Sequence, residues 1–270
     1  MPIDLSADLT VAALVSQLGD RAADFAVEVV DECASTNAAL MEAPLARDGA
    51  PGAVLVARCQ TAGKGRRGHR WMAWPDSSLT FSLRWHFRRH GPAPAGLSLV
   101  VGVAVASALE KVGVTGLFLK WPNDVLVQGA KLAGILVELR PERQAGTVAV
   151  IGIGLNLAIP PGASIPGQPA VTGLADLMAV VPPPGLLLGE ILRTLADMLD
   201  LYDQAGFAAF RGAWLQRHAH QGATVTISGD GIQQVGICEG VDEDGALLLR
   251  DPRGLHRVLS GDVSLRRAPP

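Results

Sequence analysis

Cysteine is scarce in this chain, with three residues among 270, at Cys33, Cys59 and Cys238. They lie far apart, and neither a C-x-x-C pair nor histidines at metal-ligand spacing accompany them. This pattern excludes a disulfide-stapled scaffold and gives no indication of a zinc site. We therefore expect a reducing compartment, the cytoplasm.

The chain also lacks an unbroken apolar segment that could cross a membrane or direct export. Residues 91–109 carry no charge, but Pro92, Pro94 and Gly96 break the first third of this stretch. Near the N-terminus, Asp4 and Asp8 stand where a signal peptide would carry cations. We expect neither a membrane span nor an export signal.

Charge of one sign is absent as well. The chain has 23 Lys and Arg against 26 Asp and Glu, a net charge of -3. This balance excludes a protein whose whole surface binds nucleic acid or anionic lipid. Because 49% of the residues are hydrophobic, the chain can bury a real core, and its length suggests about two domains.

The periodicity of the apolar residues predicts a mixed α+β fold. We expect helices at 36–41, 97–109, 186–201 and 207–217, and strands at 25–30, 54–57, 78–85, 117–119, 125–127, 131–139 and 147–157. Asp8 is the expected cap of a further helix that ends at Leu18, and Ser35 or Thr36 caps the helix at 36–41. After Gly222, short strands with glycine turns at 224–227, 234–239, 246–249 and 255–259 predict a small barrel. We divide the chain into domains 1–220 and 221–270.

Positive charge is concentrated in one region. Between Arg58 and Arg89 the chain has eight Lys or Arg and one acid, Asp76. At its centre, residues 60–71 combine three glycines with Lys64, Arg66 and Arg67, which predicts a loop that binds an anion. A flexible solvated loop remains an alternative. The G-x-G-x-x-G spacing here is no dinucleotide fingerprint, because neither a helix nor the required acid follows.

A second cluster, Lys120-Trp121-Pro122-Asn123-Asp124, follows a predicted strand, and Lys131 lies across the predicted hairpin from it. These residues form either a polar site or an ordinary turn with Trp121 in the core. No serine or cysteine has the setting of a nucleophile. The residues therefore favour electrostatic catalysis on an anionic substrate.

Five ordered motifs make the chain resemble the biotin protein ligases. They are Ser35-Thr36-Asn37, Gln60 with Gly63-Lys64-Gly65-Arg66-Arg67-Gly68, the cluster 120–124, Lys131 to Glu138, and Gly152 to Asn156. The resemblance implies a mixed sheet like that of class II aminoacyl-tRNA synthetases, flanked by helices, with a C-terminal SH3-like barrel. It also implies that biotin reacts with ATP to give biotinyl-adenylate and pyrophosphate, and that biotin then passes to a lysine of a carboxyl carrier protein.

The resemblance assigns roles to named residues. The implied catalytic residues are Arg66, Lys131 and Asp124. Biotin is expected to contact Ser35, Thr36, Asn37, Gln60, Gly63, Arg66, Lys131 and Gly134. The adenylate is expected to contact Lys64, Arg66, Arg67, Trp71, Lys120, Asn123 and Asn156, with Mg²⁺ as a companion of ATP. Lys64 and His69 depart from the family pattern, since many members have arginine at both places.

The resemblance also bears on partners. A biotin carboxyl carrier protein is the expected partner, a homodimer is left open, and no membrane is expected. Fewer than thirty residues precede the first ligase strand, so we do not expect the DNA-binding domain that some members carry, or a nucleic-acid partner. Two alternatives stay open: a lipoate protein ligase, and a non-catalytic module that senses biotin.

Overall fold

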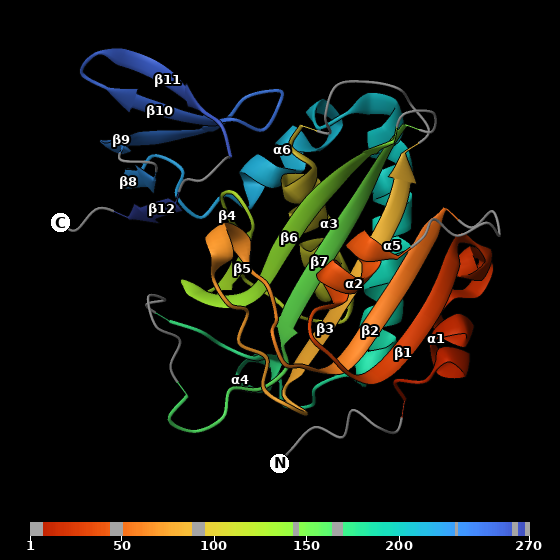
Figure 1. The fold of residues 1–270 in the computed structure, drawn as a ribbon. Coiled ribbons are helices and arrows are strands. Elements are labelled where there is room, and N and C mark those ends of the chain that lie inside the picture. Colours follow the sequence, from red (N-terminus) through yellow and green to blue (C-terminus); the bar gives the residue numbers. More distant parts are fainter. Residues whose placement is uncertain are drawn as a thin grey trace.

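Two sheets organise the protein. The computed structural model describes residues 8–43, 51–87, 95–142, 146–163, 170–229, 232–260 and 264–267. Within these residues, seven strands form one mixed sheet in the order β1-β2-β3-β7-β6-β5-β4 (Figure 1). Its strands are β1 (Phe25–Cys33), β2 (Gly52–Gln60), β3 (Ser78–Phe87), β4 (Leu117–Lys120), β5 (Asp124–Val127), β6 (Ala130–Glu142) and β7 (Gly146–Asn156).

The second sheet is smaller and antiparallel, in the order β11-β10-β9-β8-β12. Its strands are β8 (Thr224–Gly229), β9 (Ile232–Val241), β10 (Leu247–Asp251), β11 (Gly254–Val258) and β12 (Ser264–Arg267). The helices are α1 (Val11–Leu18), α2 (Thr36–Glu42), α3 (Leu97–Lys111), α4 (Leu174–Leu177), α5 (Pro184–Ala205) and α6 (Ala208–Gln216), with 3-10 turns at η1 (Gly19–Asp24) and η2 (Arg66–Gly68). The predicted mixed sheet with flanking helices and a small C-terminal β unit is confirmed.

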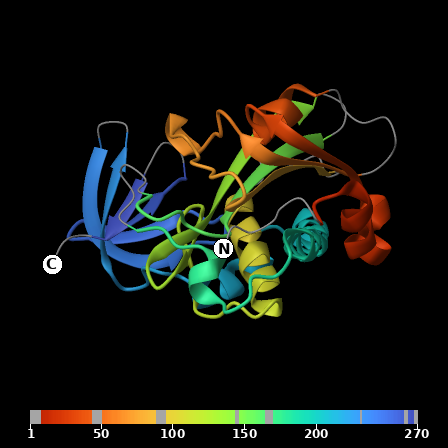
Figure 2. The same cartoon turned by 90° about the horizontal axis from the view of Figure 1, so that it is seen from below.

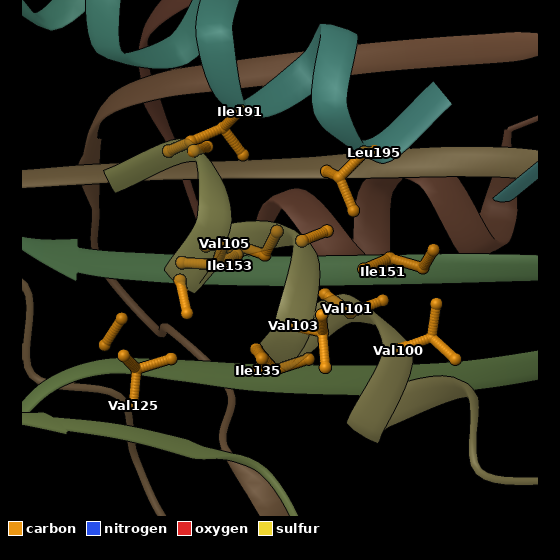
Figure 3. Packing of buried hydrophobic residues seen from close by; sticks show 14 of the residues in the cluster. Val100, Val101, Val103, Val105, Val125, Ile135, Ile151, Ile153, Ile191 and Leu195 are labelled. Atoms are coloured by element: carbon orange, nitrogen blue, oxygen red, sulfur yellow. The ribbon is translucent and has the colours of Figure 1, made fainter. Parts of the chain in front are cut away.

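Helices α3 and α5 cover one face of the large sheet, as Figure 2 shows from below. Figure 3 shows the apolar contact in detail: valines of α3 meet isoleucines of β6 and β7, with Ile191 and Leu195 of α5 beside them. Val100, Val101 and Val105 have no exposed surface. Each such side chain contributes about 1.5–3 kcal/mol through its removal from water. This packing buries one face of the sheet, so the site must lie elsewhere.

The opposite face of the sheet carries α2 and small or polar residues. Strand alternation places Gly134, Gly152, Gly154, Thr80 and Ser82 on this face, because paired residues of adjacent strands point to the same side. These small side chains leave room above the sheet for α2 and for the Trp71 ring. The site described below lies here.

The first helix begins differently from the prediction. Thr10, not Asp8, caps α1, since its hydroxyl accepts a hydrogen bond from Ala13 N. The Asp8 carboxylate instead accepts from Gly185 N at 2.8 Å, in the first turn of α5. The expectation failed because a helix distant in sequence also has unpaired N–H groups.

The segment that leads to the small sheet, and one turn of that sheet, contact the region around β4. Leu119 N donates to Arg217 O at 2.7 Å and Ala219 N donates to Leu119 O at 2.9 Å, so residues 217–219 extend the large sheet beyond β4. Trp121 is buried and its Nε1 donates to Gly245 O at 3.1 Å, in the turn between β9 and β10. No helix in the described ranges is long and apolar enough to span a membrane.

Candidate active site

The cationic glycine-rich segment is a small hairpin. Trp71 N donates to Gly63 O at 2.9 Å and Gly65 N donates to His69 O at 2.7 Å. Arg67 turns the chain with a φ of 58°. Gly63 is a glycine for steric reasons, because a Cβ there would lie 2.8 Å from the carbonyl oxygen of Trp71. The segment is therefore an ordered structure that presents its cations on a fixed backbone.

This hairpin borders a cavity of about 600 Å³. The walls are residues 61–70 together with Leu136 and Glu138 of β6. The side chains of Lys64 and Arg67 are exposed, whereas Arg66 is half-buried. The volume is in the range typical of small-molecule sites.

Trp71 leaves the hairpin and lies flat against the sheet. Gly134 and Gly154 are directly opposite each other on β6 and β7. A Cβ on Gly154 would lie 2.2 Å from the Trp71 ring, and one on Gly134 would lie 2.9 Å from it. The two glycines therefore make room for the indole. The backbone approach expected for a ligand at Gly134 is taken by Trp71 and Lys131 in this structure.

Five polar residues, Gln60, Thr36, Ser82, Asn37 and Glu138, form a line of hydrogen bonds that we call the buried polar chain. Its middle members Thr36, Ser82 and Asn37 are buried, and Gln60 and Glu138 at its ends are half-buried. Gln60 Oε1 accepts from Thr36 N at 2.8 Å, and the hydroxyls of Thr36 and Ser82 are 2.7 Å apart. Ser82 Oγ donates to Asn37 Oδ1 at 2.7 Å, and Asn37 Nδ2 donates to Glu138 Oε2 at 2.7 Å. Each of these four contacts can pair one donor with one acceptor.

The local sequence explains how these side chains meet. Ser35 begins α2, and its hydroxyl accepts from Ala38 N at 3.4 Å, so Thr36 and Asn37 fall in the first turn. Gly152 opens the space for the amide of Asn37, because a Cβ there would lie 2.5 Å from Asn37 Oδ1. The chain therefore depends on a glycine of β7 and a cap of α2.

A charged cluster occupies the turn between β4 and β5. Lys131 Nζ lies 2.7 Å from Asp124 Oδ1, and Lys120 Nζ lies 3.7 Å from Asp124 Oδ2. Lys131 Nζ is also 5.5 Å from the centroid of the Trp71 ring, within the range of a cation–π contact. Two ammonium groups around one carboxylate leave a net positive charge at this place.

Arg66 connects the hairpin with this cluster and with the segment that follows β11. Its Nη1 donates to Asn123 Oδ1 at 3.4 Å and its Nη2 donates to Ser260 O at 2.5 Å. Asn123 is itself fixed, since its Nδ2 donates to Ile135 O at 2.8 Å. The guanidinium is therefore held between the turn at 120–124 and the segment after β11.

Two buried polar atoms have no protein partner within the described ranges and lie in this region. They are Trp71 Nε1, a donor, and Asn156 Oδ1, an acceptor. The Nδ2 atom of Asn156 donates to Lys131 O at 3.3 Å and to Thr172 O at 3.2 Å, which leaves its oxygen facing away from both. Buried polar atoms without partners cost free energy, so they are typical of ligand sites.

His220, which lies near Lys120, adds no positive charge to the charged cluster at neutral pH. Burial, the nearby Lys120 and His218, and Arg267 lower the pKa of His220 to about 4. The imidazole is therefore neutral at neutral pH, and the lysines supply the positive charge next to Asp124.

The structure thus brings the predicted residues into two groups. Lys120, Asp124 and Lys131 contact one another, with Asn123, Arg66 and Trp71 around them. Thr36, Asn37 and Gln60 form the other group with Ser82 and Glu138, which the sequence analysis gave no role. Ser82 was hidden in a strand whose polar positions look like a solvated face, although this residue has no exposed surface.

Comparison with known proteins identifies the family. The pattern of the Biotin/lipoate A/B protein ligase family matches residues 32–156, and that of the Biotin protein ligase C terminal domain matches residues 221–266. The biotin–acetyl-CoA-carboxylase ligase of Paracoccus denitrificans is 36% identical over 236 residues, which cover 85% of this chain and 96% of that protein. The chain belongs to the biotin protein ligase family.

Two further members of the biotin protein ligase family support this assignment. The bifunctional ligase/repressor of Escherichia coli K12 is 33% identical over 218 residues, 80% of this chain and 67% of that protein. The biotin protein ligase of Aquifex aeolicus, solved with biotin and ATP, superposes with a TM-score of 0.77 at 29% identity and covers 90% of this chain and 99% of that one. The fold predicted from the resemblance, with its C-terminal SH3-like domain, is confirmed.

Proposed function

We propose that this protein is an ATP-dependent biotin protein ligase that makes biotinyl-adenylate and transfers biotin to a lysine of a biotin carboxyl carrier protein. The observation that carries the proposal is the arrangement of one site. A cationic cluster on the turn at 120–124 and on Lys131 adjoins Arg66, and both Arg66 and Glu138 of the buried polar chain line the cavity. Its relatives named above bear the same activity in their names.

The cationic side of the site suits the first step. A carboxylate oxygen of biotin attacks the α-phosphorus of ATP, the bond to the β-phosphate breaks, and pyrophosphate leaves. Both reactants are anions, so they repel each other, and negative charge builds up on the phosphate oxygens. Lys131 and Arg66 would stabilise this charge, because they are fixed in place before the substrates react. Lys120 and the exposed Lys64 and Arg67 would contact the nucleotide.

Asp124 suits the second step. The amine of the acceptor lysine attacks the acyl carbon, AMP leaves, and the amine must lose a proton. The Asp124 carboxylate, which Lys131 holds at 2.7 Å, would orient this amine and take the proton. Lys131 and Lys120 hold this carboxylate in a defined position, which supports a role in orienting the amine.

The part of the site around the buried polar chain suits the biotin ring. We place Ser35, Thr36, Asn37 and Gln60 there, with Gly63 and Gly134 as points of close approach. Trp71 packs over Gly134 and Gly154 and contacts the charged cluster through Lys131. Asn123 and Asn156 would contact the nucleotide, and the unpaired Trp71 Nε1 and Asn156 Oδ1 would gain partners when substrate binds.

Mg²⁺ would accompany ATP. The described residues hold no group of three or more His, Cys, Asp or Glu that could bind a metal by themselves. This fits an ion that is held mainly by phosphate oxygens and one or two protein oxygens. The buried Asn156 Oδ1 is a protein oxygen of the right type.

The remaining assignments follow the same proposal. We keep the domain division at residue 220, which agrees with the start of β8 at Thr224. The cytoplasm is the expected compartment, in keeping with three free thiols and a need for ATP. The carrier would be the biotin-accepting part of a carboxylase.

Pyrophosphate exchange into ATP tests the function directly. It measures adenylate formation without the carrier, with biotin, lipoate or no acid as substrate. We expect exchange with biotin alone. Exchange with lipoate alone would assign the chain to lipoate ligation, and binding of biotin without exchange would assign it to sensing.

A further inference from the structure

The buried polar chain has a direction that proton counting reveals. An ionised carboxylate accepts hydrogen bonds and donates none. The atom of Asn37 that faces Glu138 must therefore be Nδ2, and Oδ1 must face Ser82. Because Oδ1 only accepts, Ser82 must use its single hydroxyl proton on Asn37. The charge of Glu138 thus determines where a proton two residues further along the chain points.

The direction continues to Thr36. Once Ser82 has given its proton to Asn37, its oxygen can only accept, and the hydroxyl of Thr36 lies 2.7 Å away as the donor. The alternative acceptor, Gln60 Oε1, is farther from this hydroxyl at 3.2 Å and already accepts from Thr36 N at 2.8 Å. The Thr36 proton therefore faces Ser82, and its oxygen lone pairs remain.

At the Gln60 end, the buried polar chain then presents one hydrogen-bond donor and one acceptor. Gln60 Oε1 is held by Thr36 N, so Gln60 Nε2 is the free end of the amide, and it donates to no protein atom in the described ranges. An acceptor on Thr36 thus lies next to a donor on Gln60. The cyclic urea of biotin has an N–H beside a C=O, which complements this pair, whereas the dithiolane of lipoate has neither group.

We propose that Ser82 and Glu138 are positioning residues that set this donor and acceptor pattern for the urea ring of biotin. Ser82 has no exposed surface, and Glu138 reaches the chain from the cavity wall. Both act through Asn37 and Thr36. This proposal rests on the proposed function. It explains why the site would prefer biotin, which has a cyclic urea, to lipoate, which has none.

Glu138→Gln tests the inference because it keeps the shape and adds a donor. The new amide can present either end to Asn37, so the amide of Asn37 is free to turn and the chain can reverse. In biotin-dependent pyrophosphate exchange, we expect the KM for biotin to rise at least about tenfold. The kcat at saturating biotin and the KM for ATP should stay within about threefold, because the cationic cluster is untouched.

The double variant Asn37→Asp/Glu138→Gln provides the rescue. It moves the carboxylate one residue along the chain, and the carboxylate introduced next to Ser82 can only accept the Ser82 proton, which restores the direction. We expect the double variant to recover most of the affinity for biotin that Glu138→Gln loses. Glu28→Gln, on the exposed side of β1, is the matched control and should behave like the wild type.

Two results would overturn the inference. One is an unchanged KM for biotin in folded Glu138→Gln, and the other is a double variant that is folded but no better than Glu138→Gln. Ser82→Ala interrupts the chain at its middle and should raise the same KM selectively, so an unchanged value there also refutes the proposal if Glu138→Gln does not fold. A wild type without biotin-dependent exchange would refute the proposed function instead.

Discussion

The two sides of the site differ in how they are built. The buried polar chain joins α2, β2, β3 and β6 through hydrogen bonds and has one ionised group, Glu138, at its end, and Thr36, Asn37 and Ser82 are at most 3% exposed. The charged side consists of long cationic side chains on the hairpin and turns, and Lys64 and Arg67 are open to solvent. A ring with fixed donors and acceptors is recognised by preformed hydrogen-bonding partners, whereas the charge that develops on a reacting phosphate is stabilised by cations that are already in place.

Loss of the Lys131 ammonium group should have the largest effect on catalysis, because it removes charge from the cationic part of the site and leaves the buried polar chain intact. We expect Lys131→Met to lower the kcat of pyrophosphate exchange about 10³-fold, because a fixed charge beside the reacting phosphate is removed. The affinity for biotin should change less. Lys111→Met, a remote lysine that pairs with Glu190, is the control. A loss smaller than about tenfold would contradict the role of Lys131.

Arg66→Gly should separate adenylate formation from adenylate retention. The variant removes the links from the hairpin to Asn123 and Ser260. We expect biotinyl-adenylate to dissociate about 10 to 100 times faster, with biotin appearing on bystander lysines. Mass spectrometry of a mixture of the carrier and an unrelated protein would measure this. Labelling confined to the carrier, or the same spread with the exposed control Arg253→Gly, would contradict it.

Gly154→Ala should destabilise the packing of Trp71 against the large sheet. Its Cβ would lie 2.2 Å from the Trp71 ring, so the indole must move. We expect a loss of about 2 kcal/mol in the free energy of unfolding, measured by urea titration. Gly212→Ala in α6 is the control, since no heavy atom lies within 4 Å of the added carbon, and it should gain about 0.5–1 kcal/mol. Equal stability of the two variants would show that Trp71 does not need the space.

Mild acid should lower the free energy of unfolding through His220, which lies near Lys120. The pKa of His220 is lowered to about 4 in the folded protein, against about 6.5 in the unfolded chain, so protons bind preferentially to the unfolded state. This contribution to stability is complete above about pH 6.5 and is lost as the pH falls toward 4. Between about pH 7 and pH 4.5 we expect a loss of about 1–2.5 kcal/mol, since His220 is only half-buried. Urea titration should show a smaller loss in His220→Gln, and an equal loss would contradict the assignment.

Trp121→Phe should give the smallest effect. The change keeps the aromatic ring in the core but removes the hydrogen bond from Nε1 to Gly245 O, which joins the turn at 120–124 to the small sheet. We expect a loss of about 1 kcal/mol in unfolding free energy and a modest rise in the KM for the carrier. Unchanged stability would mean that this bond does not hold the two sheets together.

Much of the architecture could be predicted from the sequence. The helix at 97–109 and the strand at 147–157 have strong patterns, and the structure places α3 and β7 over nearly the same residues. The hairpin turn at Gln128-Gly129 is confirmed, with both residues at positive φ. The cap of α1 was wrong, because a local pattern cannot show that Asp8 reaches an α5 N–H far along the chain.

The sequence by itself determined the ingredients of the site: glycines among cations at 60–71, the polar turn at 120–124, and the order of the motifs. Local spacing carries that information. Only the tertiary structure decided which polar residues become partners, because sheet register sets Ser82 opposite Gly152 and brings Asn37 of α2 over both. The same register places Gly134 opposite Gly154 and so makes room for the Trp71 ring. Hydrogen bonds between residues far apart in the chain depend on this alignment, which no local pattern encodes.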